Sequence, residues 1–116
     1  MRLRRPEDFR KVRSEGRSWA HSLMILYCRS NELERTRVGI TASRKVGNAV
    51  ARNRARRLLR EAARRLYSRI EDGWDIVLVA RRSLVRANFA QVDAALRLML
   101  DRAGVLQSDV DHLGTV

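Results

Sequence analysis

The segment from Asn48 to Ile70 spaces apolar and basic residues as an α-helix does, and this pattern limits what the chain can fold into. Gly47 breaks the chain before it, Asn48 can cap a helix, and the pattern ends near Asp72 and Gly73. One face of the helical wheel is apolar, with Ala51, Ala55, Leu58, Leu59, Ala62, Leu66 and Ile70. The opposite face holds Asn53, Arg56, Arg57, Arg60 and Arg64, and the two shoulders hold Arg52 and Arg54. Such a helix must bury one face and display the other.

The charge of this region indicates a polyanionic partner. Residues 44–69 contain ten basic side chains and one acid, Glu61, within a chain of 116 residues whose net charge is +12. Like charges one helical turn apart repel by roughly a few tenths of a kcal/mol, so the bare helix is destabilised by its own arginines. Nucleic acid or an anionic membrane surface would offset this repulsion. The alternative is a solvated face, although solvated faces usually mix charges of both signs.

Elements on both sides of this helix predict an α+β domain in which helices shield a small mixed sheet in two layers. A first short helix begins at Pro6 and stops at Gly16, and a last helix runs from a cap at Asn88 to Gly104. Apolar runs predict three strands, at residues 19–28, 37–42 and 74–80. The first two are joined by a short loop, so we expect them to pair antiparallel, and the third to be buried on both faces.

Domain organisation follows from length and pattern. We assign residues 1–104 to a single domain, because the chain has room for one modest core. Residues 105–116 are mildly acidic and aliphatic without a clear period, and we interpret them as a tail that can be flexible.

The sequence offers little for protein-borne catalysis. The single cysteine, Cys28, lies in an apolar run and excludes an intramolecular disulfide or a cysteine zinc site; we expect no disulfide-linked partner. No Ser/His/Asp or Cys/His constellation is evident, and no metal site made by protein alone. The acids Glu71, Asp72 and Asp75 cluster around a turn, which we expect them to cap and solvate.

No segment of the sequence indicates export or a membrane. The basic N-terminus is followed by Pro6, Glu7 and Asp8 rather than by an apolar signal region. No apolar stretch reaches the length of a membrane span. We therefore expect a cytoplasmic protein without a membrane partner.

A specific motif surrounds the start of the basic helix. Residues 43–61 read Ser-Arg-Lys-Val-Gly-Asn-Ala-Val-x-Arg-Asn-Arg-x-Arg-Arg-Leu-Leu-Arg-Glu. This stretch resembles the RNR signature of the bacterial ribonuclease P protein family. The resemblance extends over nearly the whole domain, taking in residues 7–9, Tyr27, residues 37–39 and residues 75–81.

The resemblance implies a function and a fold. Members of this family form a ribonucleoprotein endonuclease that removes the 5′ leader from precursor tRNA, and its RNA carries the chemistry with bound Mg²⁺. The protein is expected to dock its RNR helix on the ribonuclease P RNA and to hold the leader in a cleft between the sheet and the first helix. A left-handed βαβ crossover is also expected, against the general right-handed rule.

The resemblance also assigns roles to residues. The residues expected to bind the catalytic RNA are Arg52, Asn53, Arg54, Arg56, Arg57 and Arg60. Those expected to bind the leader are Phe9, Arg13, Tyr27, Arg44, Lys45 and Arg81. Aromatic platforms with a basic groove suit single-stranded RNA, but ordinary core packing is the alternative for Phe9 and Tyr27. Relatives often have an aromatic residue at the position of Arg13, so the leader contact there becomes a guanidinium contact and the leader preference stays open.

Two rival classes share the charge pattern. A ribosomal or RNA-chaperone module would have the same charge and a small α+β fold. A membrane-surface protein would use the basic amphipathic helix, but the apolar face of this helix is rich in alanine and lacks Trp and Phe. The oligomeric state of an assembled enzyme is not indicated by the sequence.

Overall fold

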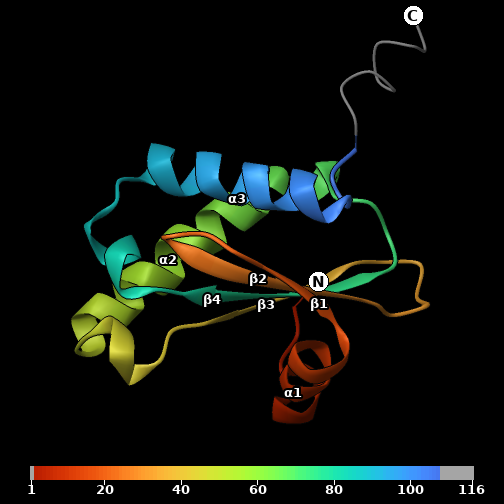
Figure 1. The fold of residues 1–116 in the computed structure, drawn as a ribbon, viewed down its shortest axis with the longest axis horizontal. Helices are drawn as coiled ribbons and strands as arrows, with labels where there is room; N and C mark the ends of the chain where they lie inside the picture. Colours follow the sequence, from red (N-terminus) through yellow and green to blue (C-terminus); the bar gives the residue numbers. More distant parts are fainter. Residues whose placement is uncertain (1, 108–116) are drawn as a thin grey trace, which may run out of the picture.

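The structure, a computed structural model, describes residues 2–107, and Figure 1 shows a sheet with helices on both of its faces. The helices are α1 (Pro6–Glu15), α2 (Ala49–Leu66) and α3 (Phe89–Ala103), with short 3₁₀ turns η1 (Arg44–Val46), η2 (Tyr67–Arg69) and η3 (Arg82–Arg86). The strands are β1 (Arg17–Ala20), β2 (Met24–Ser30), β3 (Arg37–Thr41) and β4 (Trp74–Ala80). The predicted α+β class with a mixed sheet is confirmed.

The first predicted strand is in fact a hairpin. The chain turns at residues 21–23, where the Leu23 amide donates to Nδ1 of His21 at 3.0 Å, and β1 and β2 then pair antiparallel. A turn built on a histidine ring has no Gly, Pro or Asn signal, so the apolar run from Trp19 to Cys28 looked continuous.

The predicted pairing of β2 with β3 is wrong. The strand order is β1-β2-β4-β3, with β4 antiparallel to β2 and parallel to β3. The side chains of β4 are near-continuously apolar and must be buried on both faces of the sheet. A central position, with β2 and β3 at its two edges, allows this burial. The expectation that β4 is buried on both faces is thereby confirmed, and β3, α2 and β4 form a parallel βαβ unit whose left-handedness stays a prediction.

The expected helix ends are largely confirmed. The side chain of Asn48 accepts from the Ala51 amide at 2.9 Å, and Asn88 forms a capping box with Gln91. Gly104 ends α3 with a left-handed φ of 76°. The helix α2 stops at Leu66, however, and the predicted continuation to Ile70 tightens into η2.

The sheet has two cores of unequal size. The helices α2 and α3 cover one face, where Leu26, Leu59, Ile76 and Leu96 belong to one large buried cluster. The helix α1 covers only part of the other face, as Figure 1 shows, over a small cluster of Leu3, Val12 and Val77. The second face is therefore left partly open.

The described chain continues past the predicted domain boundary. Val105 is fully buried, Leu106 pairs with Ile70, and the Gln107 amide donates to the Arg69 carbonyl at 2.7 Å. Residues 105–107, expected to begin a tail, thus pack on the turn before β4. The remainder of the predicted tail, 108–116, lies outside the described residues.

Candidate nucleic-acid interface

The exposed face of α2 is built as the wheel predicted. Its buried side consists of Ala55, Leu58, Leu59, Ala62, Ala63 and Leu66, all packed toward the sheet and α3. On the other side Asn53, Arg57, Arg60 and Arg64 are exposed. No ion pair or hydrogen bond within the described part of the chain engages the guanidinium groups of Arg57, Arg60 or Arg64. These three groups are therefore available to an external anion.

Two other arginines of α2 bond to neighbouring elements and stabilise the fold. The guanidinium of Arg54 donates to the carbonyl oxygens of Val85 and Ala87, each at 3.0 Å, and so fixes η3 and the start of α3 against α2. Arg65 forms an ion pair with Asp93 of α3 at 3.0 Å, and this hydrogen-bonded carboxylate raises the pKa of Arg65. The shoulder position predicted for Arg54 is correct, and its side chain is half-buried because of these bonds.

Asn53 is oriented by its neighbour one turn later. Arg56 donates to Oδ1 of Asn53 at 3.0 Å and approaches the Ala42 carbonyl at 3.4 Å. Arg52 lies 3.5 Å from the Gly47 carbonyl. The amide nitrogen of Asn53 keeps its donors for a partner, since no acceptor in the described residues engages it.

The open face of the sheet carries alternate residues of each strand. Tyr27, Val77 and Gly39 lie in register in one row, and α1 covers this row. A Cβ atom on Gly39 would lie 2.6 Å from Cζ of Phe9, so only glycine lets the Phe9 ring rest on β3. Phe9 and Tyr27 are half-buried: they pack on the small cluster, as the core-packing alternative expects, and still expose ring surface, so leader binding stays a prediction.

The next row extends this surface beyond α1. Ile25 of β2 pairs with Val79 of β4, and both side chains are half-buried. We call Phe9, Ile25, Tyr27 and Val79 together the platform. The guanidinium of Arg13 lies 5.3 Å from the centroid of the Tyr27 ring, so this arginine contacts the ring.

Basic residues follow the platform where the strands end. Arg81 comes directly after β4 and donates to the His21 carbonyl at 3.2 Å. Arg44 and Lys45 are exposed in η1, and Arg82 donates to the Lys45 carbonyl at 3.3 Å. The structure thus places Phe9 and Arg13 on α1, Tyr27 on β2 beneath it, and the other three predicted leader residues beyond the strand ends. Because η1 directly precedes α2, these basic residues connect the platform to the arginine face of the helix.

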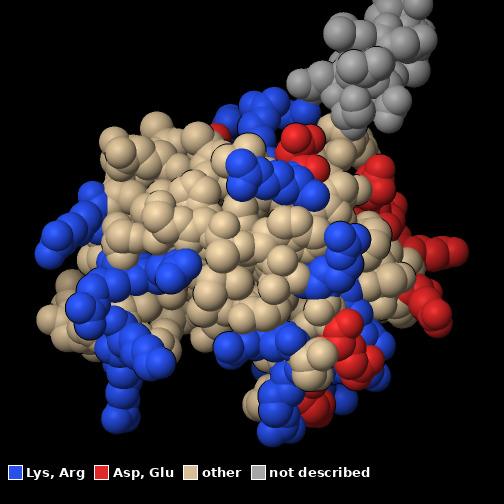
Figure 2. All heavy atoms as spheres, viewed as in Figure 1, with Lys and Arg blue, Asp and Glu red and all other residues tan. Residues whose placement is uncertain are grey.

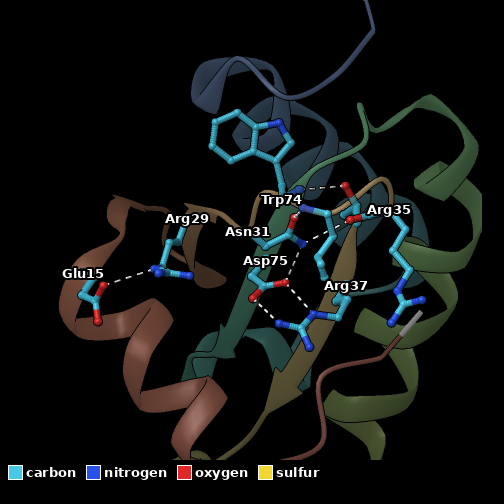
Figure 3. A network of polar contacts seen from close by, with 9 residues as sticks. Glu15, Arg29, Asn31, Arg35, Arg37, Trp74 and Asp75 are labelled. Atoms are coloured by element: carbon cyan, nitrogen blue, oxygen red, sulfur yellow. Dashed lines mark hydrogen bonds and ion pairs between the residues drawn. The ribbon is translucent and has the colours of Figure 1, made fainter.

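Asp75 does not cap a turn, contrary to the sequence-based expectation. It is only 2% exposed, and it accepts hydrogen bonds from Nε and Nη2 of Arg37 at 2.8 and 2.7 Å and from Asn31 at 2.9 Å (Figure 3). Burial raises the pKa of Asp75, but the bonds from Arg37 and Asn31 outweigh burial and hold the pKa below its usual value. An acid inside the apolar run of β4 was the available sequence signal for this buried pair.

The acids of the surface are concentrated toward one end of the molecule. In Figure 2 most of the visible acids lie at the right of the molecule, among basic residues, whereas Lys and Arg dominate the left, where η1, η3 and the start of α2 lie in Figure 1. Glu32 and Glu34 of the β2–β3 loop and Glu71 and Asp72 of the turn before β4 are exposed. A hydrogen bond from Asn31 to the Gly73 carbonyl joins this loop to this turn. A polyanion would be repelled by this end of the molecule.

The described residues form neither a metal-binding cluster nor a membrane-spanning helix. Among residues 2–107, no group of three or more His, Cys, Asp or Glu is placed to hold a metal ion. No helix in the same residues has the length and apolarity to span a membrane. Burial raises the pKa of the Cys28 thiol to about 12, so it has little nucleophilic character.

Comparisons with known proteins agree with the geometry. The family model described as Ribonuclease P matches residues 1–104. The ribonuclease P protein component of Roseiflexus sp. (strain RS-1) is 44% identical over 108 residues, covering 92% of this chain and 88% of that protein. The solved RNase P protein of Staphylococcus aureus is 32% identical with a TM-score of 0.82, covering 91% of this chain and 97% of the other. That of Thermotoga maritima is 34% identical with a TM-score of 0.77, covering 87% and 96%.

Proposed function

Because the chain belongs to the ribonuclease P protein family and is thereby a protein component of a tRNA-processing endoribonuclease, we propose that it binds the catalytic RNA and the precursor-tRNA leader. The RNA would then cleave the 5′ leader to make the mature tRNA end. In this proposal the protein contributes binding and positioning, and no side chain of the protein takes part in the cleavage step.

The exposed face of α2 is the observation that carries the proposal. Arg57 and Arg60 have no acidic partner within residues 2–107, and Asn53 is held by Arg56 with its amide donors free. Guanidinium groups bind phosphate through paired hydrogen bonds and release condensed counterions. Together with Arg52, this surface would dock on the catalytic RNA; Arg54 would act mainly by holding α2 in place.

The platform suits the single-stranded leader. Half-exposed Phe9 and Tyr27 offer ring surface on which unpaired bases can stack, and Arg13 adds a cation beside Tyr27. Arg44, Lys45 and Arg81 would continue the path along the leader phosphates. The leader and the catalytic RNA would thus meet the protein at adjacent surfaces.

The catalytic Mg²⁺ is assigned to the RNA in this proposal. The protein would favour metal binding indirectly, because its arginines neutralise RNA phosphates that otherwise repel one another at low Mg²⁺. We place this activity in the cytoplasm, with precursor tRNA as the substrate.

Reconstitution tests the proposal. The protein mixed with a ribonuclease P RNA at low Mg²⁺ should restore 5′ processing of precursor tRNA that the RNA alone performs poorly, and the protein alone should cleave nothing. Cleavage is followed with end-labelled precursor tRNA. Absence of any stimulation over RNA alone would refute the proposal and favour a general RNA-binding module.

The assignment of the platform to the leader has its own test. The reconstituted enzyme should bind precursor tRNA more tightly than mature tRNA, and replacement of Phe9 by Ala should reduce that preference. Loss of one stacked base corresponds to roughly fivefold or more in affinity. Equal binding of precursor and mature tRNA by the wild-type complex would contradict the assignment.

A further inference from the structure

A groove beside α2 adjoins the exposed arginine face of this helix and shares Arg60 and Arg64 with it. It encloses about 650 Å³ between α2 and the edge strand β3. Its basic lining residues are Arg2, Arg4, Arg60 and Arg64, and its remaining lining residues are Val38, Ile40, Ala63 and Tyr67. The groove therefore combines four guanidinium groups with an apolar floor and one aromatic ring, without an acid.

The N-terminal segment brings two of these arginines to the groove. The Leu3 amide donates to the Val38 carbonyl at 3.0 Å, and Arg2 pairs with Val38 in parallel fashion, so the segment extends the sheet beyond β3. Side chains alternate along an extended chain. Leu3 is 2% exposed in the cluster beneath α1, and Arg2 and Arg4 consequently point to the opposite side, toward α2.

The helix supplies the other two arginines. Arg60 and Arg64 are one turn apart on α2 and lie on the same face. None of the four guanidinium groups has an ion pair or hydrogen bond with a described residue. Four like charges around one hollow repel one another, so the arrangement is stabilised when an anion enters.

The aromatic ring is held in a fixed position. The hydroxyl of Tyr67 donates to the Thr36 carbonyl, and Thr36 is itself 1% exposed. The anchored ring therefore lines the groove in a fixed position, together with the apolar side chains of Val38 and Ala63. A base can stack on this ring while its phosphates reach the guanidinium groups.

We propose that this groove binds an unpaired nucleotide of the catalytic RNA, with its base against Tyr67 and its flanking phosphates on Arg2, Arg4, Arg60 and Arg64. This inference rests on the proposed function. The catalytic RNA is the favoured source because Arg60 belongs both to the groove and to the exposed face of α2, whereas the platform lies on the opposite side of the sheet. The N-terminal segment thereby becomes part of the RNA-binding surface.

The phosphate contacts are tested by salt dependence. The double variant Arg2→Ala/Arg4→Ala should bind the catalytic RNA more weakly, and the slope of log affinity against log salt should fall by about 1.5. The control Arg10→Ala/Lys11→Ala removes the same charge from exposed positions of α1, on the opposite side of the sheet from the groove, and should change the slope much less. Equal slopes for the two double variants would overturn the proposal. Unfolding midpoints should agree with wild type, because the side chains of Arg2 and Arg4 make no hydrogen bond or ion pair with a described residue and the backbone pairing of Arg2 with Val38 is kept.

The stacked base is tested at Tyr67. Tyr67→Phe and Tyr67→Leu both remove the hydroxyl that bonds to Thr36, but only the leucine removes the ring. The affinity for the catalytic RNA should be about fivefold or more lower for Tyr67→Leu than for Tyr67→Phe. Equal affinities would overturn the assignment of a nucleotide to the groove.

Measurements on the assembled enzyme test separately which RNA supplies the nucleotide and whether the proposed function is correct. At saturating protein, Arg2→Ala/Arg4→Ala should retain the wild-type preference for precursor over mature tRNA. Loss of this preference with an unchanged salt slope would place the leader in the groove and overturn the choice of catalytic RNA. If the wild-type protein fails to stimulate cleavage, the proposed function is refuted. If the wild-type protein stimulates cleavage but Arg2→Ala/Arg4→Ala has the same salt slope as the control, only the groove proposal is refuted.

Discussion

At the scale of single residues, Asp75 is the one whose environment departs most from its sequence context. Its carboxylate lies inside the central strand and is held by Arg37 of β3 and Asn31 of the β2–β3 loop. The side chain of Arg37 remains 25% exposed, so solvent weakens the pair to some extent. The bonds nevertheless connect three segments that are distant in sequence.

Replacement of Asp75 by Asn should lower the free energy of unfolding at neutral pH by about 2–3 kcal/mol, because Arg37 then keeps a charge without its partner. The folded pKa of Asp75 is lower than the ordinary value, so its contribution is present above about pH 4 and is lost as the pH falls through the folded pKa. The variant should therefore lose less stability between neutral and acid pH than wild type. Urea unfolding at both pH values measures this difference.

The exposed Asp72 provides the matched control. Asp72→Asn should leave both the stability and its acid dependence close to wild type, within about 0.5 kcal/mol. If Asp75→Asn loses as much stability on acidification as wild type, the charge of Asp75 does not contribute to the free energy of unfolding.

At the scale of elements, α2 divides its arginines between the fold and the proposed RNA contact. Arg54 is bonded to two carbonyl groups of η3 and the residue that follows it, whereas Arg57 has no partner within residues 2–107. Arg54→Ala should lower the free energy of unfolding by about 2–3 kcal/mol, because two partly buried carbonyls lose charged donors. Arg57→Ala should leave stability within about 0.5 kcal/mol and reduce the salt slope of RNA binding by about 1.

Chemical denaturation and RNA binding on the same two variants separate these roles. Arg65→Ala is the control for lost charge on the same helix, since its guanidinium is already paired with Asp93. If Arg54→Ala is as stable as wild type but binds RNA poorly, Arg54 contacts RNA rather than stabilising the fold, and the proposed division of the α2 arginines is wrong.

At the scale of the whole molecule, the concentration of acids toward one end should fix how the protein sits on RNA. The acidic end around Glu32 is expected to face away from the phosphates, and the start of α2 at Ala49 to face them. A hydroxyl-radical probe on Glu32→Cys should leave the bound catalytic RNA uncut, and one on Ala49→Cys should cleave it. The native Cys28 is buried and its pKa is about 12, so the probe attaches only to the introduced thiol.

The cleavage pattern is read from end-labelled RNA. Equal cleavage from the two positions would mean that RNA surrounds the molecule, and would contradict an orientation set by charge.

Local patterns in the sequence determined the helices and the charged face. The spacing of Leu58, Leu59 and Leu66 fixed which side of α2 is buried, and Asn48 and Asn88 marked two helix starts, because caps and 3.6-residue periodicity involve only neighbouring residues. The RNR motif, and with it the resemblance to the ribonuclease P protein family, could likewise be identified from a contiguous stretch of sequence.

Only the tertiary structure decided what depends on partners far along the chain. The insertion of β4 between β2 and β3, the pairing of Arg37 with Asp75 and the return of Arg2 and Arg4 to Arg60 all join residues separated by more than 35 positions. No local propensity encodes such pairings. They are fixed when burial of β4 on both faces selects one sheet order and brings those side chains together.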